Sequence, residues 1–154
     1  MDVLSVLVAD HPEIQFVKGE RCCWSSENHT ITYVENTSEE SVWGILHELG
    51  HALLGHNTYK TDVELLQKEM LAWEKACELA ARYNIALDED HVQDCLDSYR
   101  DWINKRSTCP RCGVKTLSSA DNIYQCFNCQ TTWKVSPARH HRAYRRKTQK
   151  LPQV

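Results

Sequence analysis

Residues 41–55, SVWGILHELGHALLG, carry the pattern His-Glu-x-x-His at positions 47–51. Thr37 followed by Glu40 forms a capping box, and Gly55 is a typical helix stop, so we expect one helix across this stretch. Histidines four positions apart on a helix are separated by about 40° around the axis and about 6 Å along it. Both imidazoles, His47 and His51, can therefore reach a single metal ion from one face.

Glu48 lies about 100° around the helix from His47, where it flanks a bound ion instead of ligating it. Zinc lowers the pKa of a coordinated water to about 7 and polarises a carbonyl group, and a flanking carboxylate can take the water proton. This is the chemistry of amide hydrolysis. The motif therefore predicts a catalytic zinc with Glu48 as the general base.

A catalytic zinc site needs a third protein ligand and an open fourth position. Four nearby residues carry suitable donor atoms: Glu64, Glu69, Glu74 and His56. We favour Glu69, because the small residue Ala72, three positions on, would let two helices approach closely. His56 follows His51 by five residues, about 140° around a continued helix, and only an unusual turn would bring it back.

The remaining pattern up to residue 106 mixes helices with short strands. Residues 3–8 favour a short helix, and residues 14–34, rich in β-branched and aromatic residues between turns, favour a small antiparallel sheet of about three strands. Two helices follow the motif, the first opened by a capping box at Thr61 and Glu64. We therefore expect an α+β domain over residues 1–106, with about four helices.

Two C-x-x-C pairs follow this domain, Cys109 with Cys112 and Cys126 with Cys129, separated by 13 residues. Each pair turns so that its thiolates converge, and two such knuckles make a closed tetrahedral zinc site. A module of about 30 residues buries too little core to fold without its metal. The spacing predicts a structural zinc ribbon over residues 107–136.

Charge is distributed unevenly along the chain. Residues 1–106 hold 9 Lys and Arg against 20 Asp and Glu, a net charge of −11, whereas residues 107–154 hold 9 against 1, a net charge of +8. Residues 137–154 are basic and unpatterned, so we expect a disordered tail. The cations and Trp133 are compatible with nucleic-acid contacts, and a solvated basic tail is the other interpretation.

Composition places the chain among soluble globular proteins, with 154 residues, 42% hydrophobic and 25% charged residues, 5 Gly and 4 Pro. The longest mostly apolar stretch, residues 3–9, is about a third of a bilayer span, and neither Lys nor Arg precedes it. We therefore expect neither a membrane helix nor a secretion signal, and a cytoplasmic location without a membrane partner.

The sequence HELGHALL at residues 47–54, followed by Glu69, Ala72 and Trp73, resembles the ImmA/IrrE family of small zinc metallopeptidases. The resemblance covers about residues 14–83. It implies a compact zincin-like α+β domain, a glutamate as third zinc ligand, and a strand edge beside the metal that holds an extended peptide. Several members of the family resemble regulators that cleave a transcriptional repressor.

We therefore expect a zinc-dependent endopeptidase acting on a protein or peptide substrate, such as a regulator. It would hold one catalytic zinc at His47, His51 and Glu69 and one structural zinc at the four cysteines. The alternative is a zinc-ribbon module that binds nucleic acid or protein, with the HExxH zinc structural or vestigial. The minor alternative is a SprT-like protease, which also pairs HExxH with a zinc ribbon, although its third His has no counterpart between residues 57 and 90.

Overall fold

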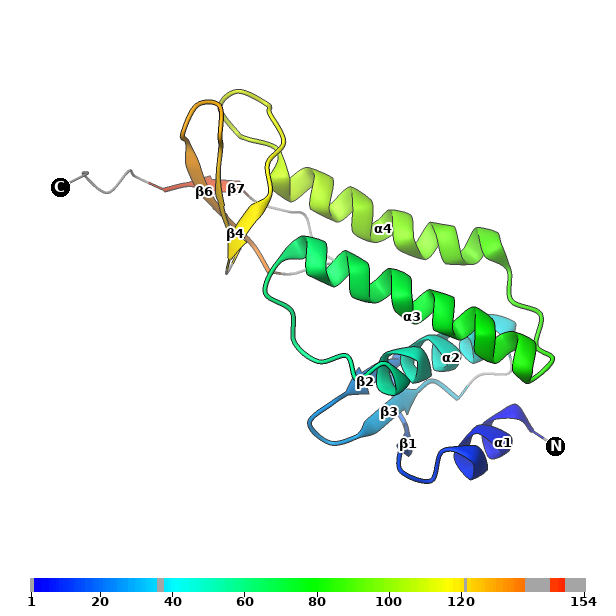
Figure 1. Ribbon diagram of the computed structural model, residues 1–154. Helices are drawn as coiled ribbons and strands as arrows, with labels where there is room; N and C mark the ends of the chain where they lie inside the picture. Colours follow the sequence, from blue (N-terminus) through cyan, green and yellow to red (C-terminus); the bar gives the residue numbers. More distant parts are fainter. Residues whose placement is uncertain (1, 36–37, 121, 138–144, 149–154) are drawn as a thin grey trace. The chain divides into compact units, whose positions relative to one another are not determined.

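The structure is a computed structural model that describes residues 2–35, 38–120, 122–137 and 145–148. Within these residues the chain is α+β, with four helices and two small sheets (Figure 1). It divides into two compact units. Unit 1 comprises the described residues of Met1–Thr58 and Lys68–Val92, and unit 2 those of Tyr59–Gln67 and Gln93–Val154.

Unit 1 contains one helix before a three-stranded sheet, one helix after it, and most of a long third helix. Its elements are α1 (Val3–Asp10), β1 (Gln15–Lys18), β2 (Cys23–Ser25), β3 (Thr30–Tyr33), α2 (Glu39–Leu53), and parts of α3 (Asp62–Arg82) and α4 (Glu89–Ser107). Helix α2 packs against β2 and β3 (Figure 1). The core is formed by fully or almost fully buried side chains, among them Leu7, Ile31, Leu46, Leu49 and Ala76.

The sheet of unit 1 is mixed, so the expectation of a purely antiparallel sheet is wrong for one of its pairs. The strand order is β1-β3-β2, with β2 antiparallel to β3 but β1 parallel to β3. The prediction assumed that strands adjacent in sequence pair with each other. Instead β3 occupies the centre, where its residue Ile31 is completely buried, and hydrophobic burial there outweighs sequential pairing.

Helix α2 begins one residue later than the expected capping box implied. Ser38 is its N-cap, and the Ser38 hydroxyl accepts a hydrogen bond from the backbone N–H of Ser41 at 3.3 Å. Thr37, the expected cap, lies outside the described residues. Serine caps at least as well as threonine, and Glu39 and Glu40 then both fall in the first turn, where the helix dipole favours acidic side chains.

The predicted start of α3 is confirmed at Thr61, whose hydroxyl accepts the backbone N–H of Glu64 at 3.2 Å. In a complete capping box the Glu64 carboxylate would accept the backbone N–H of Thr61. It accepts the backbone N–H of Lys60 instead, at 2.9 Å. The predicted stop is also confirmed. Helix α3 ends at Arg82, and Asn84 has a φ of 55°, the left-handed conformation that commonly follows a helix.

Unit 2 contains a four-stranded antiparallel sheet in the order β4-β5-β6-β7. The strands are β4 (Ser118–Ala120), β5 (Ile123–Gln125), β6 (Thr132–Val135) and β7 (Arg145–Lys147). The expectation of disorder over residues 137–154 is wrong for β7. Its sequence has no apolar pattern, but its backbone pairs with the free backbone groups at the edge of β6. The rest of this predicted tail, residues 138–144 and 149–154, lies outside the described residues.

A buried arginine joins the helical and ribbon parts of unit 2. The Arg106 guanidinium is fully buried and donates to Asp62 Oδ2 at 3.2 Å, and the Tyr124 hydroxyl donates to the same carboxylate. The Trp133 indole N–H donates to the backbone oxygen of Arg106 at 2.9 Å. The predicted divisions after residues 106 and 136 stay predictions, although contacts group residues 93–106 with the ribbon.

Within the described parts of the chain, none of the helices combines the length and the apolar character that crossing a membrane would require.

Candidate metal centres

Helix α2 brings two imidazole rings together in unit 1. The Nε2 atoms of His47 and His51 lie 3.2 Å apart, as the four-residue spacing predicts. The indole ring of Trp73, from α3, stacks on the His47 ring with centroids 4.3 Å apart and an interplanar angle of 26°. This contact fixes the orientation of the His47 ring inside the core.

Close packing between α2 and α3 delivers the third donor, Glu69. A Cβ placed on Gly50 would lie 2.5 Å from the backbone oxygen of Ala72, a distance that real Cβ atoms essentially never show. Only glycine fits at this crossing, and Ala72 is itself fully buried. The expectation that a small residue at 72 allows close approach is therefore confirmed. The approach places Glu69 Oε2 at 3.0 Å from His47 Nε2 and Glu69 Oε1 at 3.4 Å from His51 Nε2.

These separations match the ligand shell of a tetrahedral metal ion. Zinc bonds of about 2.0–2.1 Å at tetrahedral angles place neighbouring ligand atoms about 3.3 Å apart. The two Nε2 atoms lie 3.2 Å apart, and each faces a different Glu69 oxygen, His47 facing Oε2 at 3.0 Å and His51 facing Oε1 at 3.4 Å. Two imidazoles and a carboxylate are also typical zinc donors. This group could therefore hold a metal ion, and its donors are compatible with zinc.

Electrostatics keeps the Glu69 carboxylate in the form that a cation requires. Burial by itself would raise the pKa of Glu69, but hydrogen bonds and charge from His47 and His51 outweigh it and lower the pKa to about 2. The carboxylate is therefore ionised throughout the neutral range. A metal ion would take the place of the protons in the hydrogen bonds from His47 and His51 to Glu69.

The other three candidates for third ligand do not join this group. Glu74 is exposed on α3, and Glu64 caps the start of that helix. His56 does return to the site, because Gly55 has a φ of +66° and makes the unusual turn. It approaches the wrong side of His51, however, with the two Nδ1 atoms 2.8 Å apart.

His56 is placed to form a hydrogen bond with His51 Nδ1. One Nδ1 atom must donate to the other, and His51 Nε2 is free to bind a metal when His51 Nδ1 carries the proton. Burial, followed by the charge of His51, lowers the pKa of His56, which favours a neutral ring that accepts this proton. The Trp24 indole N–H donates to the backbone oxygen of His56 at 3.0 Å and holds the turn in place. The sequence offered one signal for this role, a histidine directly after a helix-ending glycine.

Glu48 lies beside the three donors and is not one of them. Burial raises its pKa above the ordinary value of 4.5, while the charges of His47 and His51 and a backbone hydrogen bond from Trp24 act in the opposite direction. Trp24 also lines an open cavity of about 480 Å³ that includes Leu53, His56 and Asn57. Trp24 thus contacts the Glu48 carboxylate through its backbone and also borders the open cavity.

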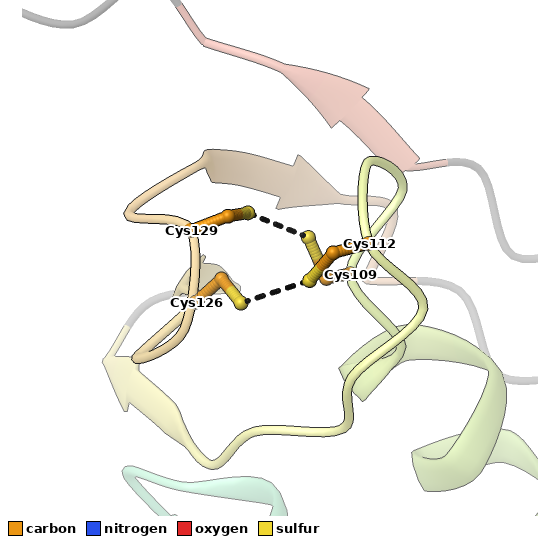
Figure 2. A group of neighbouring side chains, drawn as sticks. All are labelled: Cys109, Cys112, Cys126 and Cys129. Carbon is orange, nitrogen blue, oxygen red and sulfur yellow. Dashed lines mark hydrogen bonds between the residues drawn. The ribbon is translucent and has the colours of Figure 1, made fainter.

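The four ribbon cysteines form a second group in unit 2. Cys109 Sγ lies 3.6 Å from Cys129 Sγ, and Cys112 Sγ lies 3.5 Å from Cys126 Sγ, so each contact joins one knuckle to the other (Figure 2). Zinc–sulfur bonds of about 2.3 Å at tetrahedral angles separate sulfurs by about 3.7 Å, whereas a disulfide would need about 2.05 Å. The group is therefore suited to a metal ion.

Backbone turns build each cysteine knuckle. Gly113 has a φ of 76°, and its N–H donates to the Cys109 oxygen at 3.0 Å. In the second knuckle Gln130 has a φ of 59°, and its N–H donates to the Cys126 oxygen at 3.0 Å. Hydrogen bonds from Thr131 lower the pKa of the Cys129 thiol to about 6, toward the thiolate that metals bind.

No protein-family model, no curated protein and no solved structure matches this chain.

Proposed function

We propose that the chain is a zinc-dependent endopeptidase whose unit 1 is a minimal zincin-like domain of the ImmA/IrrE type. The observation that carries this proposal is the convergence of His47, His51 and Glu69 donors beside the carboxylate of Glu48. Three protein donors leave a fourth tetrahedral position for water or substrate, as catalytic zinc sites require. The cysteine group supplies all four ligands itself, which is typical of a structural site.

When bound, a zinc ion supplies Lewis-acid chemistry that polarises the peptide carbonyl and acidifies water. Glu48 accepts a proton from the attacking water as the water oxygen bonds to the carbonyl carbon. Glu48 then returns that proton to the nitrogen of the leaving amine as the C–N bond breaks. A raised pKa suits this double role. A carboxylate with a higher pKa binds the water proton more tightly, and it still acts as a base near neutral pH.

The surroundings of the site offer a place for an extended peptide. Strand β2 is at the edge of its sheet, packs against α2, and carries Trp24. Backbone N–H and C=O groups on an edge strand can pair with an added strand. The cavity beside Trp24 and His56 would receive a substrate side chain.

A cleavage assay with a matched pair of glutamine variants tests the proposal. We would incubate the zinc-loaded 154-residue chain with a proteome-derived peptide library and identify new termini by mass spectrometry. The side chain in Glu48→Gln has the shape of glutamate but cannot carry a proton. We therefore expect cleavage to fall by about 10²–10⁴-fold with metal content unchanged. Glu40→Gln changes an exposed glutamate on the same helix and should retain full activity.

Equal cleavage by wild type and Glu48→Gln would refute the assigned role of Glu48. Absence of any cleavage by zinc-loaded wild type would instead favour the alternative, in which the site in unit 1 is structural or vestigial.

A further inference from the structure

Unit 2 carries a sheet face that the peptidase proposal does not use. Along β6, Trp133 and Val135 are buried whereas Lys134 is exposed, so Lys134 points away from the core. The strand register places Ile123 of β5 on one side of Lys134 and Arg146 of β7 on the other. All three side chains are exposed. They form one row across the outer side of the sheet.

A second row of neutral polar residues runs beside the first. Gln125 pairs with Thr132 in the strand register. The backbone N–H of Thr148 donates to the Thr132 oxygen at 3.0 Å, and the hydroxyls of these two threonines lie 2.6 Å apart. We call the two rows together the basic face, which consists of Ile123, Gln125, Thr132, Lys134, Arg146 and Thr148.

The basic face contains an unneutralised pair of like charges. Lys134 and Arg146 are directly opposite each other on neighbouring strands, where Cβ atoms are about 5 Å apart and like charges destabilise the sheet. No carboxylate of the described residues pairs with either side chain. Asp121, outside the described part, is the single acidic residue among residues 107–154. A bound anion would remove the repulsion between the two cations.

We infer that the basic face binds single-stranded nucleic acid. The regularly spaced phosphates of such a strand provide anions for Lys134 and Arg146, and the amide and hydroxyl row provides neutral hydrogen-bonding groups. The net charge of +8 on residues 107–154, against −11 on residues 1–106, directs a polyanion to this end of the chain.

An exposed aromatic ring favours nucleic acid over an acidic peptide. Phe127, in the second cysteine knuckle, is 70% exposed. Gln130 links it to the basic face, since Gln130 Nε2 donates to the Phe127 oxygen at 3.2 Å and Gln125 Nε2 donates to Gln130 Oε1 at 3.1 Å. Unpaired bases stack on exposed aromatic rings, whereas the Asp and Glu side chains of an acidic peptide have no aromatic ring to stack there.

Fluorescence anisotropy with a labelled oligothymidine of about 20 nucleotides tests this inference on the zinc-loaded 154-residue chain. We expect affinity to fall steeply between about 50 and 200 mM salt. Replacing both cations, Lys134→Gln with Arg146→Gln, should weaken binding by at least about tenfold and reduce the salt slope by about 1.4, since each lost phosphate contact contributes about 0.7. Phe127→Ala should weaken binding with an unchanged slope.

Three controls make the outcome decisive. Metal content confirms that the ribbon of each variant is folded, and Lys75→Gln, which removes an exposed salt bridge on α3, should bind like wild type. Glu48→Gln should also bind like wild type, so this inference can succeed or fail independently of the peptidase proposal. Unchanged binding by the double variant, no binding by wild type, or equal competition by polyglutamate of the same length would overturn it.

Discussion

The two groups of candidate metal ligands are assembled by different kinds of structure. In the cysteine group, each pair is placed by its own backbone turn, at Gly113 and at Gln130, and sulfur contacts between residues 14 and 20 positions apart bring the two knuckles together. In the histidine group, α2 supplies two donors, but the third arrives from 22 residues along the chain and depends on the packing of α2 against α3. Two backbone turns that face each other build the first site, and the packing of two helices completes the second.

This difference is also one of chemistry. Four thiolates close the cysteine site, so a metal there can stabilise the ribbon but has no position for a reactant. The histidine site has three donors and a flanking carboxylate, Glu48. Zinc could therefore support folding in unit 2 and hydrolysis in unit 1. Variants should separate the two roles.

The largest effect is expected from Cys126→Ser. Metal binding to structural sites of this kind is worth about 10–16 kcal/mol, and most of it stabilises the fold. We expect the ribbon strands β5 and β6 to lose protection from hydrogen exchange and the protein to lose one metal ion, while the histidine site keeps its own. Cys23→Ser, at an exposed cysteine of β2, is the matched control and should leave both properties unchanged. Retained protection in Cys126→Ser would show that the ribbon folds without its metal.

A smaller effect is expected from Gly50→Ala, which acts on the tertiary contact. The new methyl group would meet the backbone oxygen of Ala72 at 2.5 Å and force α2 and α3 apart. Overpacking of this kind costs about 1–3 kcal/mol, and Glu69 would move away from the histidines. Thermal unfolding and zinc affinity both measure the change. Gly44→Ala on the same helix meets only the flexible Cys22 side chain, at 3.2 Å, and should be milder. Equal zinc affinity in the two variants would contradict the packing argument.

The two groups of metal ligands differ in how much of each could be predicted from the sequence. The i, i+3 cysteines and the i, i+4 histidines are local patterns, so both were assigned from spacing alone. Glu69 was selected from several acids by the smallness of Ala72, but the matching role of Gly50 became visible only in the packed structure. The parallel pairing of β1 with β3 could not be predicted, because burial of Ile31 at the sheet centre depends on tertiary contacts.

His56→Ala is expected to act on the histidine site alone. Loss of the acceptor beside His51 Nδ1 should weaken zinc binding by about 10–100-fold, as for other partners that orient metal ligands. His56→Asn places an amide oxygen near the same position and should recover part of the affinity. Competition with a zinc chelator gives the constants, and the metal of the cysteine group serves as the internal reference. Unchanged affinity in His56→Ala would remove the assigned positioning role.

The smallest effect concerns the titration of Glu48. Burial disfavours the ionised carboxylate, so in metal-free unit 1 its pKa should lie above 4.5. A divalent cation at the neighbouring donors favours the ionised form, and zinc should therefore lower this pKa. Carboxyl ¹³C chemical shifts followed against pH, with Glu40 as exposed control, would measure both values. A Glu48 pKa that zinc leaves unchanged would contradict the placement of the ion beside this residue.

The central claim is that the histidine group is a metal site separate from the ribbon. The most direct test is metal content per chain, by atomic emission, for wild type and His47→Ala after both proteins are loaded with zinc and freed of excess metal. We expect two zinc ions in wild type and one in His47→Ala. One zinc ion in both proteins would contradict it, because the group formed by His47, His51 and Glu69 would then bind no metal.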